Sequence, residues 1–455
     1  MATSPPPSSP RYAWYVVFVL MVIYVFAFID RQILSMMIGD LKEGLNLQRD
    51  WHAGFLMGPA FAIFYTLFGI PFGRLADTHN RRLLIAMGFG LWSLLTAGCG
   101  IAKNFWQMAL MRVGVGVGEA SLSPSAYSLI ADFFPREKLG RATAFYGMGI
   151  YFGSGLAYLI GGRAITYVKE TAAWQLPILG TVEPWQKVFF LVGLPGLLVI
   201  PLLMLTVREP IRKGLWKGSN SASKEYSASV PIFEVVLYMR QNSKTIITHN
   251  VGFALLAFSG LGTTAWLPEI FRRVYGWEMD QFGLVYGSIF ALFGALGIYG
   301  GGYFADLLSQ KGYRDAKIRV GFLSAWIWFP VGIAFPLVPD PNLAMLLVVP
   351  VVFLAAMPGA LGAASIQEVM PNNMRGQASA IYLFVVNMIG LALGPVILAM
   401  LTDYIFTGSN YGVEGIRYSL LSLTVTAHLF ATLLLWKCMY YFRDSMDRLE
   451  EVTEQ

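Results

Sequence analysis

Long apolar stretches alternate with short polar connections over most of the chain. Twelve of them reach at least about 18 residues, the length that an α-helix needs to cross the roughly 30 Å hydrocarbon core of a bilayer. The pattern therefore predicts membrane-spanning helices at residues 13–37, 52–75, 83–102, 104–134, 139–165, 188–207, 246–274, 282–307, 320–337, 345–370, 376–404 and 419–441.

One long polar segment divides the predicted helices into six and six. Residues 208–243 are basic and rich in serine, as in a flexible linker, and a short interfacial helix is expected at 233–239. The predicted parts are a disordered cytoplasmic tail, an N-terminal six-helix bundle, a cytoplasmic linker, a C-terminal six-helix bundle and a second cytoplasmic tail, at residues 1–12, 13–207, 208–243, 244–443 and 444–455.

The two halves contain matching sequence at matching places. The pattern Gly-x-x-x-Asp ends the second stretch at Gly73 and Asp77, and it ends the eighth at Gly302 and Asp306. After the fourth and tenth stretches, DFFPREKLGRATAFY and EVMPNNMRGQASAIY share an acid, Pro, Gly, two Ala and Tyr in register. Duplicated six-helix halves with a substrate site between them are typical of secondary transporters. The sequence thus predicts an all-α polytopic membrane protein made of two pseudo-symmetric six-helix bundles.

The composition supports a membrane protein and excludes other classes. Hydrophobic residues make up 56% of the chain and charged residues 13%, which leaves too little polar surface for a soluble protein of 455 residues. The net charge of +6 does not indicate nucleic-acid binding, because the basic residues lie between the apolar stretches, mostly on the side of the N-terminus. This bias predicts that both termini and the linker are cytoplasmic. Cys99 and Cys438 fall in apolar stretches, so no disulfide framework, metal site or other cofactor is expected.

Two charges lie deep in the stretch 104–134. Arg112 and Glu119 are seven residues apart, so on a helix they share one stripe about 10 Å long, with Gly116 between them and Ser123 nearby. A charge at that depth costs roughly 2.5–3.5 kcal/mol on insertion scales, so this stripe cannot face lipid. Two interpretations remain open: a buried ion pair that only locks helices together, or the charged wall of a water-filled pathway.

The first predicted helix brings two more charges to the same depth. Asp30 and Arg31 lie about 12 Å from its outer end, and Arg112 lies about as far from the outer end of its own helix. Adjacent residues on a helix point about 100° apart, so Asp30 and Arg31 cannot both face one partner. We therefore expect either that Asp30 pairs with Arg112 or that Arg31 pairs with Glu119.

Asp30 and Glu119 are the candidates for proton coupling. Burial favours the neutral form of Glu119 while a neighbouring arginine favours its charged form, so a small change of geometry can switch its protonation. The alternative is a static ion network that holds two helices together. Arg31 is also a candidate for binding a phosphate or carboxylate, because a guanidinium offers two parallel hydrogen bonds to such groups.

Further polar and aromatic residues are candidates for the wall of a substrate cavity. The candidate substrate-binding residues are Arg31, Arg112, Ser123, Thr263, Trp266 and Asn387, and Ser259, Tyr286 and Ser365 extend the same wall. Polar and aromatic residues of this kind more often join helices than contact a ligand, so packing remains the alternative. A charged spot beside apolar and aromatic walls suits an amphipathic substrate.

Two local patterns resemble signatures of the major facilitator superfamily. The matching residues are Gly73, Asp77, Arg81 and Arg82 in the loop signature between helices 2 and 3, and Arg112, Gly116 and Gly118 in the signature of helix 4. The resemblance implies a twelve-helix transporter that works by alternating access and as a monomer. It also implies that the loop residues form a cytoplasmic gate, closing helix 2 against the start of helix 11. The alternative is that these charges only set the topology.

Within that superfamily, three stretches resemble the spinster family. They are FAFIDRQILS, GVGEASLSPSAYSLIADFF and YFGSGLAYLIGG, at residues 26–35, 116–134 and 151–162. The resemblance implies proton-coupled transport of an amphipathic, lipid-like anion of the lysophospholipid or sphingoid type. The Asp-Arg pair at residues 30 and 31 is shared with organic anion symporters of the same superfamily, which are the alternative.

Other classes fit the sequence less well. A membrane-embedded enzyme is a remote alternative, because such enzymes group His, Asp or Cys near an interface, and no histidine shares the stripe of the deep acids. No nucleotide-binding loop of the GxxxxGK[ST] type is present, which disfavours an ATP-driven pump. Short termini without a sorting signal favour a bacterial inner membrane. The expected partners are a small amphipathic substrate, protons and the lipid bilayer.

Overall fold

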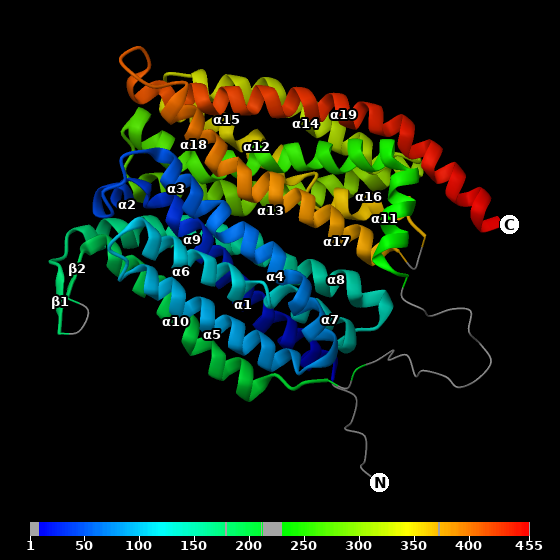
Figure 1. The fold of residues 1–455 in the computed structure, drawn as a ribbon, viewed down its shortest axis with the longest axis horizontal. Coiled ribbons are helices and arrows are strands. Elements are labelled where there is room, and N and C mark those ends of the chain that lie inside the picture. The colour runs from blue at the N-terminus through cyan, green and yellow to red at the C-terminus, as the bar shows by residue number, and fades with distance from the viewer. Residues whose placement is uncertain (1–8, 178–179, 211, 213–229, 372–373, 455) are drawn as a thin grey trace, which may run out of the picture. The chain divides into compact units, whose positions relative to one another are not determined.

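The computed structural model describes residues 9–177, 180–210, 212, 230–371 and 374–454, which are almost entirely α-helical (Figure 1). The predicted all-α polytopic fold is confirmed. Residues 1–8 of the predicted N-terminal tail, and 211 and 213–229 of the predicted linker, lie outside the described residues. Ten described segments are long and apolar enough to cross a membrane: Pro10–Met36, Asp50–Thr78, Arg81–Cys99, Pro184–Thr206, Ser243–Tyr275, Met279–Gln310, Ala316–Leu337, Pro341–Glu368, Arg375–Tyr404 and Gly412–Glu451.

The first half of the chain forms the six predicted helices, three of them in two pieces. They are α1 (Pro10–Met36), α3 and α4 (Asp50–Met57, Pro59–Thr78), α5 (Arg81–Cys99), α6 and α7 (Phe105–Glu119, Leu122–Phe133), α8 and α9 (Arg136–Gly147, Gly149–Lys169) and α10 (Pro184–Thr206). Two small elements complete this half: α2 (Ile38–Gly44) and an antiparallel hairpin of β1 (Trp174–Leu176) and β2 (Gly180–Val182).

The stretch 104–134 is broken, which corrects the single helix expected there. α6 ends at Glu119 and α7 begins at Leu122. The cause is Pro124, which has no N–H to donate to the carbonyl of Ala120 and whose ring would clash with that carbonyl in a continuous helix. The hydroxyl of Ser121 donates to the carbonyl oxygen of Gly118 at 2.9 Å, which gives a carbonyl of the last turn of α6 a side-chain partner. Glu119 therefore stands at the end of a helix rather than in the middle of one.

Two glycines of α6 allow neighbouring helices to approach it closely. A Cβ atom at Gly118 would lie 2.9 Å from the carbonyl oxygen of Gly88 in α5, and one at Gly116 would lie 2.5 Å from that of Phe61 in α4. Any larger residue would push these backbones apart. The backbone around Glu119 is consequently fixed against two other helices.

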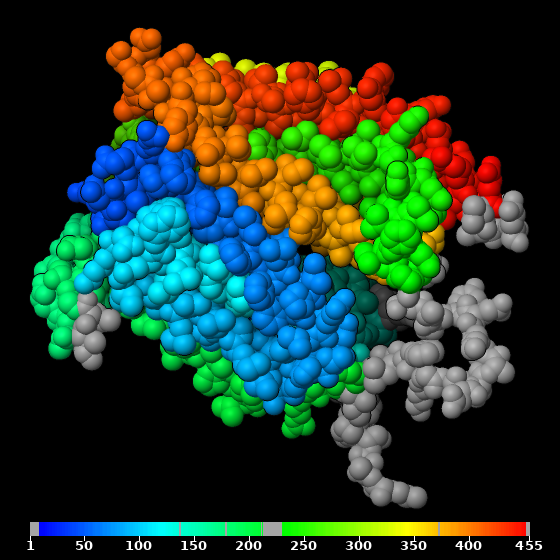
Figure 2. Space-filling model, viewed as in Figure 1, coloured from blue at the N-terminus to red at the C-terminus, as the bar shows by residue number. Residues whose placement is uncertain are grey.

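The second half follows the linker with an extra helix before its six spans. It contains α11 (Ile232–Gln241), α12 (Ser243–Tyr275), α13 (Met279–Gln310), α14 (Ala316–Leu337), α15 and α16 (Pro341–Ala356, Leu361–Glu368), α17 with η1 and α18 (Arg375–Val386, Asn387–Leu393, Gly394–Tyr404), the short η2 (Gly412–Glu414) and α19 (Gly415–Glu454). α11 coincides with the expected interfacial helix and lies at the surface beside α17 (Figure 2). α19 continues well past residue 441, where the last span was expected to end, so the predicted C-terminal tail is helical as far as Glu454.

The chain divides by its internal contacts into two compact units. Unit 1 comprises Met1–Gln48, Ala60–Leu215 and Met279–Ser288, and unit 2 comprises Arg49–Pro59, Trp216–Glu278 and Ile289–Gln455. Two segments thus join the unit of the other half of the sequence: α3 belongs to unit 2, and the start of α13 belongs to unit 1. The break between α3 and α4, at Gly58 and Pro59, is where the chain passes from one unit to the other.

Polar contacts anchor α3 in unit 2. The carboxylate of Asp403 in α18 accepts hydrogen bonds from the backbone N–H groups of Asp50 and Trp51, at 2.9 and 2.7 Å, and so caps the first turn of α3. The carboxylate of Asp50 in turn accepts a bidentate pair of hydrogen bonds from Arg273 in α12. In unit 1, the start of α13 packs on α9, where the rings of Tyr158 and Tyr286 lie 4.7 Å apart.

Candidate functional site

A buried ion pair joins α1 to the end of α6 in unit 1. Nη2 of Arg31 donates to Oε1 of Glu119, and the two side chains are 15% and 1% exposed. This is one of the two pairings that the sequence left open. Removing one partner of such a pair would leave the other charge buried alone, which is strongly unfavourable.

Asp30 faces a different neighbour from Arg31, as the 100° step between adjacent helical residues requires. Its Oδ2 accepts a hydrogen bond from the hydroxyl of Thr96 in α5 at 3.1 Å. Arg112 in α6 is also buried and lies close enough to interact electrostatically with both Asp30 and Glu119. Asp30, Arg31, Arg112 and Glu119 therefore form one buried cluster, which we call the charge network.

Three aromatic rings surround the guanidinium of Arg31. Its Cζ atom lies 4.8 Å from the ring centre of Phe28 in α1, 4.6 Å from that of Phe61 and 4.7 Å from that of Tyr65, both in α4. We call these three rings the aromatic cage. These rings are not among the residues predicted from the sequence, although their spacing contains a signal. Phe28 precedes Arg31 by one helical turn, and Phe61 and Tyr65, four residues apart, share one helix face.

Three polar atoms of the charge network have no hydrogen-bond partner among the described residues. They are Oδ1 of Asp30, Oε2 of Glu119 and Nε of Arg31. Buried polar groups in folded proteins are nearly always hydrogen-bonded, so unmatched ones need an explanation. Each acid retains an oxygen to which a proton or a polar ligand group can bind.

The other predicted substrate residues lie in different places. Ser123 is half-buried in the first turn of α7, directly after the break that follows Glu119. In unit 2, the hydroxyl of Thr263 donates to the carbonyl of Ser259 at 2.7 Å, and Nε1 of the fully buried Trp266 donates to that of Pro395 at 2.8 Å. These two bonds fit the packing alternative. Asn387 is half-buried at the first residue of η1, a π-helix, which is a rare form often found at functional sites.

Two of the predicted gate residues are fixed within unit 1. Arg81 is 1% exposed and donates to the carboxylates of Asp132 and Glu209, at 2.5 and 2.7 Å. Arg82 donates to the carbonyl oxygen of Val207 at 2.9 Å. These bonds hold the start of α5 to α7 and to the chain that follows α10. The two arginines thus have a structural role in unit 1 in addition to any role in gating.

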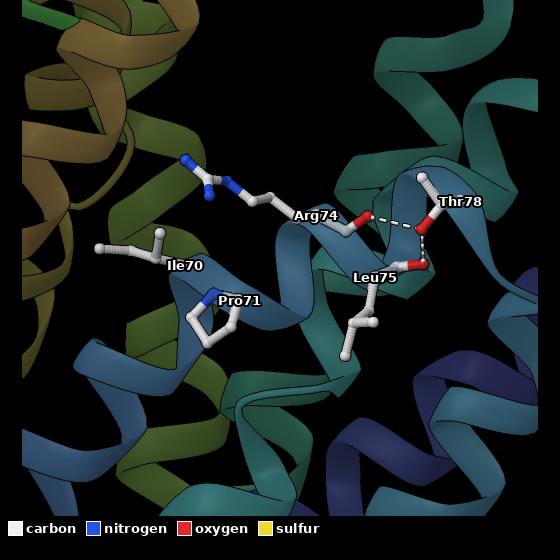
Figure 3. A pocket seen from close by; sticks show the side chains of 5 residues that line it. All are labelled: Ile70, Pro71, Arg74, Leu75 and Thr78. Carbon is white, nitrogen blue, oxygen red and sulfur yellow. Dashed lines mark hydrogen bonds between the residues drawn. The ribbon is translucent and has the colours of Figure 1, made fainter.

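The other two predicted gate residues, Gly73 and Asp77, lie in the last turns of α4. The same helix lines an open hollow, and Figure 3 shows the residues of its lining. Asp77 is exposed, and a Cβ atom at Gly73 would meet nothing within 4 Å. The hollow is lined by one face of α4, made of Ile70, Pro71, Arg74, Leu75 and Thr78. The Thr78 hydroxyl donates to backbone carbonyls of its own helix. Among the lining residues that the structure describes, Arg74 is the charged one.

Unit 2 contains a buried polar cluster of its own. Nδ1 of His249 in α12 is hydrogen-bonded to Oδ1 of Asn250 at 2.9 Å, and Nε2 is hydrogen-bonded to Oγ of Ser365 in α16 at 2.8 Å. The ring of Tyr382 in α17 lies 5.4 Å from the imidazole. We call His249, Asn250 and Ser365 the histidine cluster. In the part of the chain that the structure describes, no three His, Cys, Asp or Glu side chains are grouped to hold a metal ion.

Comparison with known proteins relates these features to a family. The sequence model described as Major Facilitator Superfamily matches residues 20–395. An "MFS-type efflux pump" of Mycolicibacterium smegmatis is 26% identical over 453 residues, which cover 97% of this chain and 96% of that protein. "Protein spinster homolog 1" of Xenopus tropicalis is 26% identical over 424 residues, which cover 88% of this chain and 75% of that protein.

Solved structures agree with the sequence matches. A crystal structure of a bacterial homologue of the human lysosomal transporter spinster, inward-facing and unoccupied, is 25% identical to this chain. The two superpose with a TM-score of 0.80 over 96% of this chain and 99% of that one. The proteins that match over most of their length are therefore transport proteins of the membrane.

Proposed function

Because this chain belongs to the major facilitator superfamily, we propose that it is a proton-coupled secondary transporter of an amphipathic, lipid-like anion. Membership in the family makes it an integral membrane protein that transports a small substrate, and not an enzyme. The similarity to spinster proteins supports the resemblance seen in the sequence, which implies a substrate of the lysophospholipid or sphingoid type.

The observation that carries the proton coupling is the buried ion pair of Arg31 and Glu119. Proton binding to Glu119 would remove the negative half of this pair and release Arg31, so the proton and the arginine compete for one carboxylate. Asp30 is the second acid of the network and also retains an unbonded oxygen. Both acids are therefore placed to exchange protons while the bonds between α1 and α6 change.

The substrate is bound, in this proposal, by the arginines of the charge network. Arg31 and Arg112 supply the positive charge that an anionic head group requires, and the aromatic cage beside them supplies apolar surface. Ser123 is a candidate contact at the start of α7. Within unit 2, Thr263, Trp266 and Asn387 stay candidates for substrate contact. Thr263 and Trp266 donate to backbone carbonyls, and Asn387 is half-buried at the start of η1.

The cytoplasmic gate is proposed at the end of α4 and the start of α5. The exposed carboxylate of Asp77 can interact with the positive N-terminal end of a helix in one state and release it in the other. Arg81 and Arg82 keep the start of α5 in place, and Gly73 lies one helical turn before Asp77. The positive-inside bias supports cytoplasmic termini, and the bacterial relatives support a bacterial inner membrane, in which we expect the protein to act as a monomer.

Reconstitution into proteoliposomes tests the function. Lysophospholipid, a phosphorylated sphingoid base and a water-soluble organic anion are offered separately, with and without an imposed pH gradient. One pH unit supplies about 1.4 kcal/mol per proton, enough for roughly tenfold accumulation at one-to-one stoichiometry. We expect gradient-dependent movement of an amphipathic substrate. Gradient-dependent movement of the water-soluble anion alone would favour the organic anion symporter, and movement that ignores the gradient would overturn proton coupling.

A further inference from the structure

The neighbours of the Arg31 guanidinium are those of a binding site for an organic cation. Rings of Phe28, Phe61 and Tyr65 lie within 4.8 Å of its Cζ atom, and the carboxylate of Glu119 accepts its hydrogen bond. Energetically significant cation–π contacts occur roughly once per 70–80 residues in proteins, whereas here three act on one group. Aromatic cages of this kind are the usual means of recognising substituted ammonium groups.

The aromatic cage is held in place by contacts that do not involve Arg31. The rings of Phe61 and Tyr65 stack 5.4 Å apart with their planes 17° from parallel. The ring of Phe28 packs edge-on against Tyr24 at 5.2 Å. The backbone of Phe61 is fixed by its close approach to Gly116. The cage would therefore keep its shape if the arginine left it.

The side chain of Arg31 has properties that allow it to move out of the aromatic cage. Its side chain is long and retains 15% exposure, whereas Glu119 beneath it is 1% exposed. Nε of Arg31 has no hydrogen-bond partner among the described residues, and one of the two Glu119 oxygens also remains unbonded. The guanidinium is thus bound by the aromatic cage and by one oxygen of Glu119. A cation from outside the protein could bind to the same cage and the same carboxylate.

We propose that the aromatic cage and Glu119 form a binding site for a substituted ammonium or guanidinium group, and that Arg31 is an internal ligand which the substrate displaces. This inference rests on the proposed function, because the substrate's anionic group is what draws Arg31 out of the cage. It narrows the substrate class to a zwitterionic amphiphile, in which a positive group lies near the anionic one.

The charge balance at Glu119 is the reason for preferring a zwitterion. If a purely anionic substrate took Arg31 away, an unpaired carboxylate would remain buried, at a large desolvation cost. A substrate that brings its own positive group to the cage replaces the charge that Arg31 removes. Arg112, beside the Phe61 ring at 5.2 Å, can then share the anionic group with Arg31.

Tetramethylammonium chloride is a suitable probe, with sodium chloride at the same concentration as the control for ionic strength. It is titrated against the purified full-length protein in detergent while thermal unfolding is followed. In Arg31→Ala the cage is vacated, so we expect a saturable rise in melting temperature. Wild type and Arg31→Lys, in which a tethered cation remains, should show no such rise.

Ring variants made in the Arg31→Ala protein locate the bound probe. Tyr65→Leu should weaken the apparent affinity about 5- to 30-fold, as expected for one desolvated cation–π contact, whereas Tyr65→Phe keeps the ring and should bind normally. An equal shift in melting temperature for wild type and Arg31→Ala would overturn the proposed site. An equal apparent affinity for tetramethylammonium in Tyr65→Leu and Tyr65→Phe would also overturn it. If Arg31→Ala does not fold, Arg31→Gln replaces it.

The two proposals fail in different ways. Binding of tetramethylammonium to Arg31→Ala, together with wild-type transport that ignores the pH gradient, would uphold the cation site and overturn the proposed proton coupling. Gradient-dependent transport with no probe binding to any variant would leave the proposed function standing and overturn the cation site.

Discussion

The charge network of unit 1 and the histidine cluster of unit 2 are both buried groups of polar side chains that join transmembrane helices, but they differ in charge and in completeness. In unit 1 two acids and two arginines meet, and three of their polar atoms lack hydrogen-bond partners among the described residues. In unit 2 both nitrogens of His249 are hydrogen-bonded to neutral partners. In the proposed function, a proton or a substrate exchanges the bonds of the incomplete network, whereas the complete cluster joins α12 to α16.

The largest difference is expected on removing one charge of unit 1. Arg31→Ala leaves Glu119 buried without its partner, so the free energy of unfolding should fall by about 3–5 kcal/mol. Arg31→Ala/Glu119→Gln removes both charges and should recover part of that loss. Chemical denaturation in detergent measures both. If the double variant were less stable than Arg31→Ala, the pair would not be a coupled ion pair.

A smaller loss of stability is expected when a substitution in unit 2 leaves a charged group with a second partner. Asp50→Asn weakens the bidentate bond to Arg273, which still has Glu269, so the loss should be about 1.5–3 kcal/mol. Arg272 also binds Glu269 but is 44% exposed, and Arg272→Ala serves as a matched control with little effect. A loss as small as that of the control would show that Asp50 does not anchor α3.

A substitution in the histidine cluster should lower the stability less than Asp50→Asn does. Ser365→Ala removes the neutral partner of Nε2 of His249, and the expected loss of stability is on the order of 1 kcal/mol. Because no charge is left unpaired, the dependence of transport on pH should stay that of the wild type. A changed pH profile in Ser365→Ala would place a titrating group in unit 2 and remove the contrast between the units.

The smallest effect is expected for an exposed ion pair. Arg314 is 39% exposed and contacts Asp447 and Glu450 of α19, which are more exposed still. Arg314→Ala should change stability by about 0–1 kcal/mol, and raising the salt concentration should reduce even that. A loss comparable to that of Arg31→Ala would mean that burial does not set the order of these effects.

The sequence predicted the apolar helices and the two possible pairings of the buried charges, because hydropathy and helical spacing are local properties. It could not choose between the pairings, since the choice depends on how α1 and α6 are rotated about their axes. The break after Glu119 had a local cause in Pro124 but was masked by the apolar run around it. The aromatic cage was missed because Phe28 and Phe61 lie on different helices, and among many aromatic residues neither is distinctive by itself.

The pH dependence of transport in three single variants tests the central claim most directly, namely that the charge network couples transport to protons. Glu119→Gln and Asp30→Asn remove the two acids of the network, and Asp315→Asn removes an equally buried acid that pairs with Arg319 outside it. We predict that Glu119→Gln and Asp30→Asn lose the pH dependence and that Asp315→Asn keeps it. Normal pH dependence in both network variants would contradict the claim.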